Sequence, residues 1–267
     1  MRRPRPLLAL FVLLFAFATA VVPAGAITNG QPDGTAHPNV GVMVVDFGAG
    51  PQRLCSGELI APTRFLTAGH CTSFLVNNPT LLGVTFDSTF NPSTSTVIPA
   101  VSVSVDPLFG KGHGDFHDLG VITLASPVAA SPVVLPTAGL LDRLGAQGGL
   151  KGQEFTIVGY GATGYAFGGG PPTPVDFFPA VRRIATSPFK ALEQNVLRLQ
   201  GNTTVTGEGG TCGGDSGSAS YLNVGGTDVA VAIVSPPVDR RCVGNDANYR
   251  LDTPSARAFL GRFVTLP

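Results

Sequence analysis

The stretch that decides the fold is TCGGDSGS, residues 211–218. A serine that attacks a carbonyl needs an accessible hydroxyl and nearby backbone N–H groups for the oxyanion that forms. Ser216 stands between Asp215 and Gly217, and two further glycines precede Asp215. Glycines let the chain turn sharply and bring bare amides close to a substrate. Taken alone, the run is also compatible with an ordinary polar turn, so its meaning depends on the rest of the chain.

Two further motifs accompany this run. LTAGHC at residues 66–71 contains His70, and HDLGVITL at residues 117–124 contains Asp118. The chain order His, Asp, Ser distinguishes one class of serine hydrolase from two others. Together the three motifs resemble the chymotrypsin/trypsin family of serine proteases, over essentially the whole chain after residue 26. An α/β-hydrolase elbow fits poorly, because Ser218 stands where Gly-x-Ser-x-Gly requires glycine and the residue order differs.

The resemblance implies an all-β fold of two Greek-key six-stranded barrels, with the active site in the cleft between them and a C-terminal helix. Residues 27–140 would form the N-terminal barrel, which carries His70 and Asp118. Residues 141–267 would form the C-terminal barrel, which carries Ser216.

Short β-rich segments separated by turn signals indicate β-barrels or a sandwich, in agreement with such a fold. The expected strands are residues 40–47, 54–60, 64–67, 81–86, 96–105, 119–124, 154–160, 181–185, 196–200, 218–222 and 229–234. Only residues 253–264 have a helical pattern, with Thr253 as the cap. Residues 139–152 read as a turn-rich divider and residues 164–174 as a surface loop.

The resemblance also implies the role of each catalytic residue. Ser216 would attack the scissile carbonyl, and His70 would take its proton and pass it to the leaving amine. Asp118 would orient the imidazole, and the N–H groups of Gly214 and Ser216 would form the oxyanion hole. Asp118 is preferred to the nearby Asp115 because a buried strand follows it directly. The chain is thus expected to be a serine endopeptidase that works through an acyl-enzyme intermediate.

The alternative from another class is a catalytically weak or inactive homologue that acts as an extracellular binding protein. Such members of the family usually lack one of the three catalytic residues, and this chain has all of them.

Residues 1–26 have the composition of an export signal. Arg2, Arg3 and Arg5 precede an apolar run of 16 residues, and Ala24-Gly25-Ala26 is a small-x-small cleavage site. The run is short for a membrane span; a retained anchor is the alternative. We expect a secreted protein that makes no membrane contact after signal removal.

The chain has four cysteines, and export favours disulfides over free thiols. Sequence alone leaves three pairings open. The resemblance favours Cys55–Cys71 and Cys212–Cys242.

Composition excludes several partners. The chain has 17 basic and 17 acidic residues, so it lacks the basic footprint of a nucleic-acid-binding protein. His113, Asp115 and His117 suggest a metal site, but no second cluster completes a ligand set, and we expect neither metal nor cofactor. The expected partners are protein or peptide substrates and protein protease inhibitors, with the chain itself a monomer.

The expected substrate pocket includes Gly210, Ser235 and Pro237. In the resembled family the pocket floor lies six residues before the nucleophile, and trypsin-like members carry aspartate there. Gly210 occupies this position, so the sequence predicts weak cleavage after Arg and Lys, unless Asp246, in the short segment 242–249, reaches the pocket and supplies a charge. Pro237 would narrow the pocket mouth.

The resemblance also implies an activation pair. In the family, a new amino terminus, often Ile-Val-Gly-Gly, folds inward and pairs with the aspartate before the nucleophile. Here Ile27-Thr28-Asn29-Gly30 follows the signal cleavage site. Signal removal would then free the ammonium of Ile27 to pair with Asp215. The alternative is an N-terminal strand that lies on the surface.

Overall fold

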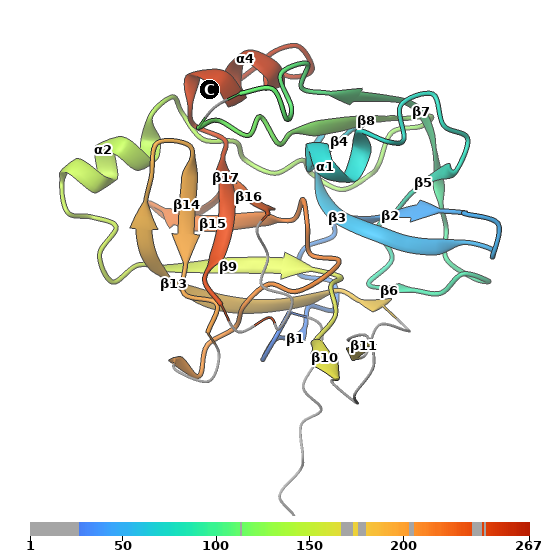
Figure 1. The fold of residues 1–267 in the computed structure, drawn as a ribbon, viewed down its shortest axis with the longest axis horizontal. Coiled ribbons are helices and arrows are strands. Elements are labelled where there is room, and N and C mark those ends of the chain that lie inside the picture. The colour runs from blue at the N-terminus through green and yellow to red at the C-terminus, as the bar shows by residue number, and fades with distance from the viewer. Residues whose placement is uncertain are drawn as a thin grey trace, which may run out of the picture.

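The computed structural model describes residues 27–112, 114–166, 173–175, 180–202, 206–236, 242 and 244–267. The expected export signal, His113 and Pro237 lie outside these residues. Two closed, six-stranded antiparallel barrels lie side by side, and a helix ends the chain (Figure 1). The predicted fold class is therefore confirmed.

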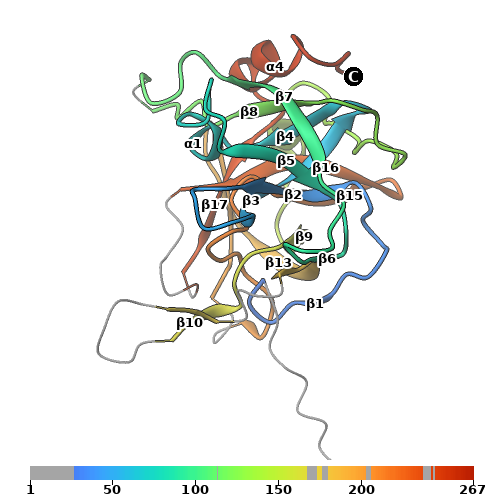
Figure 2. The same cartoon turned by 90° about the vertical axis from the view of Figure 1, so that its right-hand side faces the viewer.

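The first barrel closes in the strand order β2-β3-β4-β8-β7-β5 and faces the viewer in Figure 2. Its strands are β2 (Val40–Val45), β3 (Gln52–Ala61), β4 (Arg64–Thr67), β5 (Leu81–Thr85), β7 (Ile98–Val105) and β8 (Gly120–Leu124). Strand β2, VGVMVV, is buried along its whole length. Such a run of β-branched and apolar residues favours a strand with both faces covered.

The second barrel closes in the order β13-β14-β17-β16-β15-β9, with β9 pairing back to β13. Its strands are β9 (Glu154–Gly159), β13 (Arg183–Leu192), β14 (Val196–Leu199), β15 (Ala219–Val224), β16 (Thr227–Ser235) and β17 (Asp246–Arg250). The short β1 (Gln31–Pro32) pairs with β13, so the start of the described chain lies against this barrel.

Three features differ from the sequence prediction. Helix α2 (Leu140–Ala146) forms inside the section expected to be turns, because Asp252 Oδ2 accepts a hydrogen bond from Leu141 N at 2.8 Å and the Leu141 side chain is buried. The expected loop at 164–174 contains a two-stranded sheet, β10 (Gly164–Ala166) and β11 (Thr173–Val175). Strand β17 was not anticipated.

The remaining elements are short. Strands β6 (Thr89–Phe90) and β12 (Ala180–Val181) pair with one another. Helix α1 (Gly69–Thr72) follows β4, and helix α4 (Pro254–Leu260) ends the fold. Thr253 caps α4 as predicted, since its hydroxyl accepts a hydrogen bond from Ala256 N at 3.3 Å. Within the described ranges, no helix has the length and apolar character needed to cross a membrane.

Buried polar groups join the two barrels. The Arg182 guanidinium is 2% exposed and pairs with Asp33 at 2.8 Å. It also donates to the carbonyl oxygens of Val40 and Phe86 at 3.1 and 3.0 Å. Buried charges are tolerated when they are paired and hydrogen-bonded in this way. These contacts link the second barrel to the first.

Candidate active site

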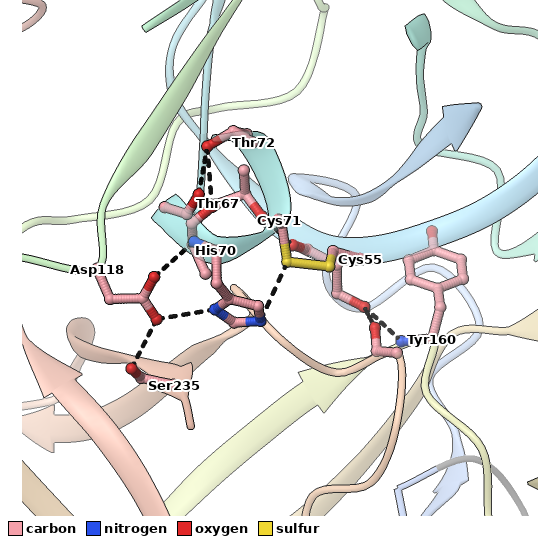
Figure 3. The surroundings of a disulfide bond; sticks show 12 residues. Cys55, Thr67, His70, Cys71, Thr72, Asp118, Tyr160 and Ser235 are labelled. Atoms are coloured by element: carbon pink, nitrogen blue, oxygen red, sulfur yellow. Dashed lines mark hydrogen bonds and ion pairs between the residues drawn. A yellow bond between two sulfur atoms is a disulfide. The ribbon is translucent and has the colours of Figure 1, made fainter. Parts of the chain in front are cut away.

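His70 and Asp118 lie together at the edge of the first barrel, where α1 and the start of β8 meet (Figure 3). Asp118 Oδ2 lies 2.9 Å from His70 Nδ1, and Asp118 Oδ1 accepts a hydrogen bond from the backbone N–H of His70 at 2.7 Å. The Asp118 side chain is buried, whereas that of His70 is 27% exposed. The carboxylate thus holds the Nδ1 side of an imidazole that is itself partly exposed.

Ser235 contributes a third contact to this pair from the second barrel. It ends β16, and its hydroxyl donates to Asp118 Oδ2 at 2.7 Å. The sequence prediction placed Ser235 in the substrate pocket and missed this hydrogen bond. Nothing in the local sequence signals it, because the two residues are 117 positions apart.

The imidazole of His70 lies between the Asp118 carboxylate and the Cys55–Cys71 disulfide (Figure 3). Its Nε2 lies 3.4 Å from Cys71 Sγ. Cys55, His70 and Cys71 also place three ligand-type atoms close together. Both sulfur atoms are bonded to each other, however, so neither is a thiolate that can ligate a metal. The second disulfide joins Cys212 to Cys242.

The segment 212–218 forms a turn in which the amides of Gly213, Gly214 and Ser216 donate no hydrogen bond to a described residue. Asp215 N donates to the Cys212 carbonyl at 3.0 Å, and Ser218 N donates to the Asp215 carbonyl at 2.9 Å. In the described part of the chain, no hydrogen bond uses the N–H of Gly214 or Ser216. Gly214 has φ +100°, a conformation that L side chains rarely adopt. Ser216 itself is half-buried.

Asp215 is fully buried beneath this turn. Its carboxylate accepts hydrogen bonds from Gly161 N at 2.7 Å and from Cys212 N at 2.9 Å. Burial raises the pKa of Asp215 to about 7, against the lowering effects of these two amides and of the Arg53 charge. The carboxylate therefore fixes the turn to the strand that opens the second barrel.

An apolar cleft opens beside His70. Its volume is about 390 Å³, and its lining residues are His70, Phe109, Gly110, Phe116, Asp118, Ser235 and Pro236. Phe116 is 52% exposed, although aromatic side chains are usually covered. An exposed aromatic wall beside an accessible imidazole is suited to holding an apolar group near Nε2.

The expected pocket floor has no room for a side chain. A Cβ on Gly210 would lie 2.5 Å from the Gly201 carbonyl oxygen. Asp246 is the acidic group beside this floor, since its Oδ2 accepts a hydrogen bond from Thr211 N at 2.8 Å. Burial raises the pKa of Asp246 to about 7, and the nearby Asp215 adds to the rise.

His117 and Asp115 belong to a separate cluster behind Asp118. His117 Nδ1 lies 3.3 Å from Asp106 Oδ2, while its Nε2 lies 3.6 Å from Asp115 Oδ2. The Tyr249 hydroxyl donates to Asp115 Oδ1 at 2.7 Å. Because the two ring nitrogens of His117 face different carboxylates, these groups do not converge on one metal position.

Comparison with known proteins agrees with this geometry. The family model described as "Trypsin" matches residues 29–255. A protein named "Trypsin" from Saccharopolyspora erythraea is 33% identical over 103 residues, which cover 38% of this chain and 43% of that protein. The matched part thus spans less than half the length of that relative. Because the family model covers most of the sequence, the chain belongs to the trypsin family.

Proposed function

We propose that the chain is an exported serine endopeptidase that uses Ser216, His70 and Asp118. The observation that carries the proposal is the buried Asp118 carboxylate 2.9 Å from Nδ1 of an imidazole whose other face is accessible. A carboxylate in this position holds the imidazole in the tautomer that leaves Nε2 free to accept a proton. Two disulfides support a working place in an oxidising compartment.

The proposed reaction proceeds in two halves. Ser216 Oγ forms a bond to the carbonyl carbon while its proton passes to His70 Nε2, and the oxyanion is stabilised by the amides of Gly214 and Ser216. The proton then goes to the leaving amine as the C–N bond breaks, which leaves an acyl-enzyme. Water attacks the ester with the same assistance and restores Ser216.

The contact between Ser216 and His70 belongs to the substrate complex in this proposal. In the described residues, Ser216 makes no hydrogen bond with His70, and His70 Nε2 faces Cys71 Sγ. Catalytic hydrogen bonds are often long in a free enzyme and tighten when substrate binds. Protein or peptide substrates would place an apolar side chain in the cleft lined by Phe109, Phe116 and Pro236.

Labelling with a fluorophosphonate tests the proposal directly. The probe forms a phosphorus–oxygen bond with an activated serine and releases fluoride. We expect the mature protein to be labelled on Ser216 and to hydrolyse casein, and the Ser216→Ala variant to do neither. A folded protein that the probe does not label would instead favour the alternative, a binding protein on a protease scaffold.

A further inference from the structure

Arg53 is a buried arginine that the catalytic mechanism does not use. It lies on β3 of the first barrel and is 3% exposed. An arginine guanidinium stays charged in proteins and is costly to bury, so a buried one is usually placed against an opposite charge. The contacts that Arg53 makes should therefore explain why this charged side chain is buried.

The guanidinium lies directly on Gly214. A Cβ built on Gly214 would collide with Nη1 of Arg53 and would lie 3.0 Å from its Cζ. Arg53 thus fills the space beside the α-carbon of Gly214, whose N–H is one of the two expected oxyanion donors. Any rotation of the peptide group that carries this N–H has to push against a side chain that is itself packed between the barrels.

The same strand holds Gly214 at a second point. The carbonyl oxygen of Gly214 accepts hydrogen bonds from Ser56 N at 3.1 Å and from Ser56 Oγ at 2.9 Å. Ser56 Oγ in turn accepts a hydrogen bond from Tyr160 N at 2.9 Å. Strand β3 therefore fixes the carbonyl of Gly214 through Ser56 and covers its α-carbon through Arg53.

Charge adds to this packing. Burial lowers the pKa of Arg53 to about 10, while the negative charge of Asp215 raises it. The Arg53 charge in turn lowers the pKa of the buried Asp215. Asp215 also interacts with a second carboxyl group, that of Asp246 on β17. Arg53 is thus the cation on the first barrel that offsets the carboxylate anchoring the turn.

We propose that Arg53 is a positioning residue for the oxyanion hole: its guanidinium covers Gly214 and balances the charge of Asp215, so that the Gly214 N–H stays directed toward substrate. The proposal rests on the proposed protease function. It differs from the expected pairing of Asp215 with the Ile27 ammonium, because Arg53 already lies on the turn in the uncut chain. A carboxylate has about four acceptor sites, so both cations can be accommodated with the two amides.

The kinetic experiment compares Arg53→Met, Arg53→Lys and Arg182→Met with wild type. Arg182 is the matched control, because it is also a buried arginine between the barrels but contacts Asp33 rather than the serine turn. For Arg53→Met we expect kcat to fall about 10²-fold, as for loss of one oxyanion donor, with KM little changed. Affinity for a peptide aldehyde, whose adduct places an oxyanion in the hole, should fall by a similar factor. Arg53→Lys keeps the charge but not the cover over Gly214, and should restore part of kcat.

Two kinetic results would overturn the proposal. One is an Arg53→Met or Arg53→Lys enzyme with wild-type kcat and wild-type aldehyde affinity. The other is an Arg182→Met enzyme that loses kcat to the same extent as Arg53→Met, because the effect would then follow from stability alone. Melting temperatures of all variants separate these cases.

A second readout needs no catalysis. In ¹⁵N-labelled Ser216→Ala protein, the amide resonances of Gly214 and Asp215 should move on Arg53→Met and stay in place on Arg182→Met. Unchanged resonances with Arg53→Met would contradict the proposal even if the protein were not a protease. If wild type is inactive yet the resonances move as expected, the proposed function fails while the positioning role stands.

Discussion

Ser235 of the second barrel donates a hydrogen bond to Asp118 of the first, with 2.7 Å between Ser235 Oγ and Asp118 Oδ2. The carboxylate that orients His70 is therefore itself oriented across the barrel interface. A hydrogen bond to a charged group contributes more than one between neutral groups. The geometry of the proposed catalytic pair thus depends on how the two barrels pack.

Ser235→Ala tests this dependence. We expect kcat to fall about 10- to 10²-fold, since loss of a hydrogen bond to a charged group costs about 1.5–3 kcal/mol and about 1.4 kcal/mol corresponds to tenfold in rate. Ser220→Ala is the control, because Ser220 Oγ donates at 3.0 Å to Asn248, which lies within the second barrel. Steady-state kinetics should give Ser220→Ala a wild-type kcat. Thermal unfolding should show that its melting temperature is lower than that of wild type. Equal kcat for Ser235→Ala and wild type would rule out an orienting role.

Ser216→Ala should abolish peptidase activity without unfolding the protein. In a comparable protease the loss of the nucleophile costs about 10⁶-fold in turnover. Ser216 Oγ makes no hydrogen bond to a described residue that holds the fold together, so circular dichroism and melting temperature should stay near wild type. Retention of more than about a hundredth of the wild-type rate would show that another group is the nucleophile.

The two neighbouring aspartates should behave differently. Asp118→Asn is expected to lower kcat about 10⁴-fold, because an amide in place of the carboxylate favours the wrong imidazole tautomer. Asp115 accepts a hydrogen bond from the Tyr249 hydroxyl and does not contact His70, so Asp115→Asn should change stability more than kcat. Measuring kcat of both variants shows which aspartate orients His70. A large loss of kcat in Asp115→Asn alone would mean that the motif at 115–118 has been aligned wrongly.

The strand pattern predicted most strands of the barrels, because apolar β-rich runs reflect the burial that a sheet requires. The two-barrel arrangement was predicted from the family resemblance that the three motifs carry. The prediction failed where long-range contacts decide the local structure. Helix α2 has only seven residues, too few to be stable alone, and depends on Asp252 and the burial of Leu141. The hydrogen bond from Ser235 to Asp118 had no local signal at all.

Arg53 illustrates the same limit. An arginine at the second position of a strand reads as a solvent-exposed residue, because charged side chains are seldom fully buried. Its burial follows from the packing of the second barrel over β3, which brings Asp215 and Gly214 against it. A sequence pattern indicates which residues share one face of a strand. It does not reveal which residues from distant parts of the chain will pack on that face.

Asp246 gives a prediction about pH. Its pKa is raised to about 7 in the folded protein, above the ordinary 3.8, so the neutral carboxyl is the form that folding favours. The stability that this group contributes is present below about pH 4 and is lost as pH rises through about 7. Asp246→Asn should therefore make the melting temperature less sensitive to pH across this window. An unchanged pH profile would mean that Asp246 is ionised at no cost.

The same residue bears on cleavage preference. We expect weak cleavage after Arg and Lys, because Gly210 provides no charge and an unpaired cation is costly to bury. A peptide library digested with the mature protein should instead give small or medium apolar residues on the acyl side. Strong cleavage after basic residues that increases above pH 7 and disappears in Asp246→Asn would reverse this expectation and identify Asp246 as the cause.

The amino-terminal segment gives the last prediction. Ile27 is fully buried, and the next residue pairs with the expected pocket floor: Thr28 N donates to the Gly210 carbonyl at 2.9 Å, and Gly210 N donates to the Thr28 carbonyl at 3.2 Å. The Thr28 hydroxyl also donates to the Gly210 carbonyl at 2.9 Å, which gives threonine a use where family members often have valine. Ile27 and Thr28 are therefore inserted into the second barrel, whereas Asn29, Gln31 and Pro32 are exposed.

Ile27 has φ +58°, a conformation unfavourable for a β-branched residue. The torsion φ exists only while a residue precedes Ile27, so cleavage after Ala26 removes this strain and creates an ammonium next to Thr28, which pairs with Gly210. We predict that the secreted protein begins Ile-Thr-Asn-Gly, and that one extra residue before Ile27 lowers kcat at least about tenfold through loss of a charge pair with Asp215. Amino-terminal sequencing and kinetics of the two forms test this, with a mature Ile27→Val protein as the control that keeps its ammonium. A different mature terminus, or full activity in the extended form, would leave Arg53 as the cation on which Asp215 depends.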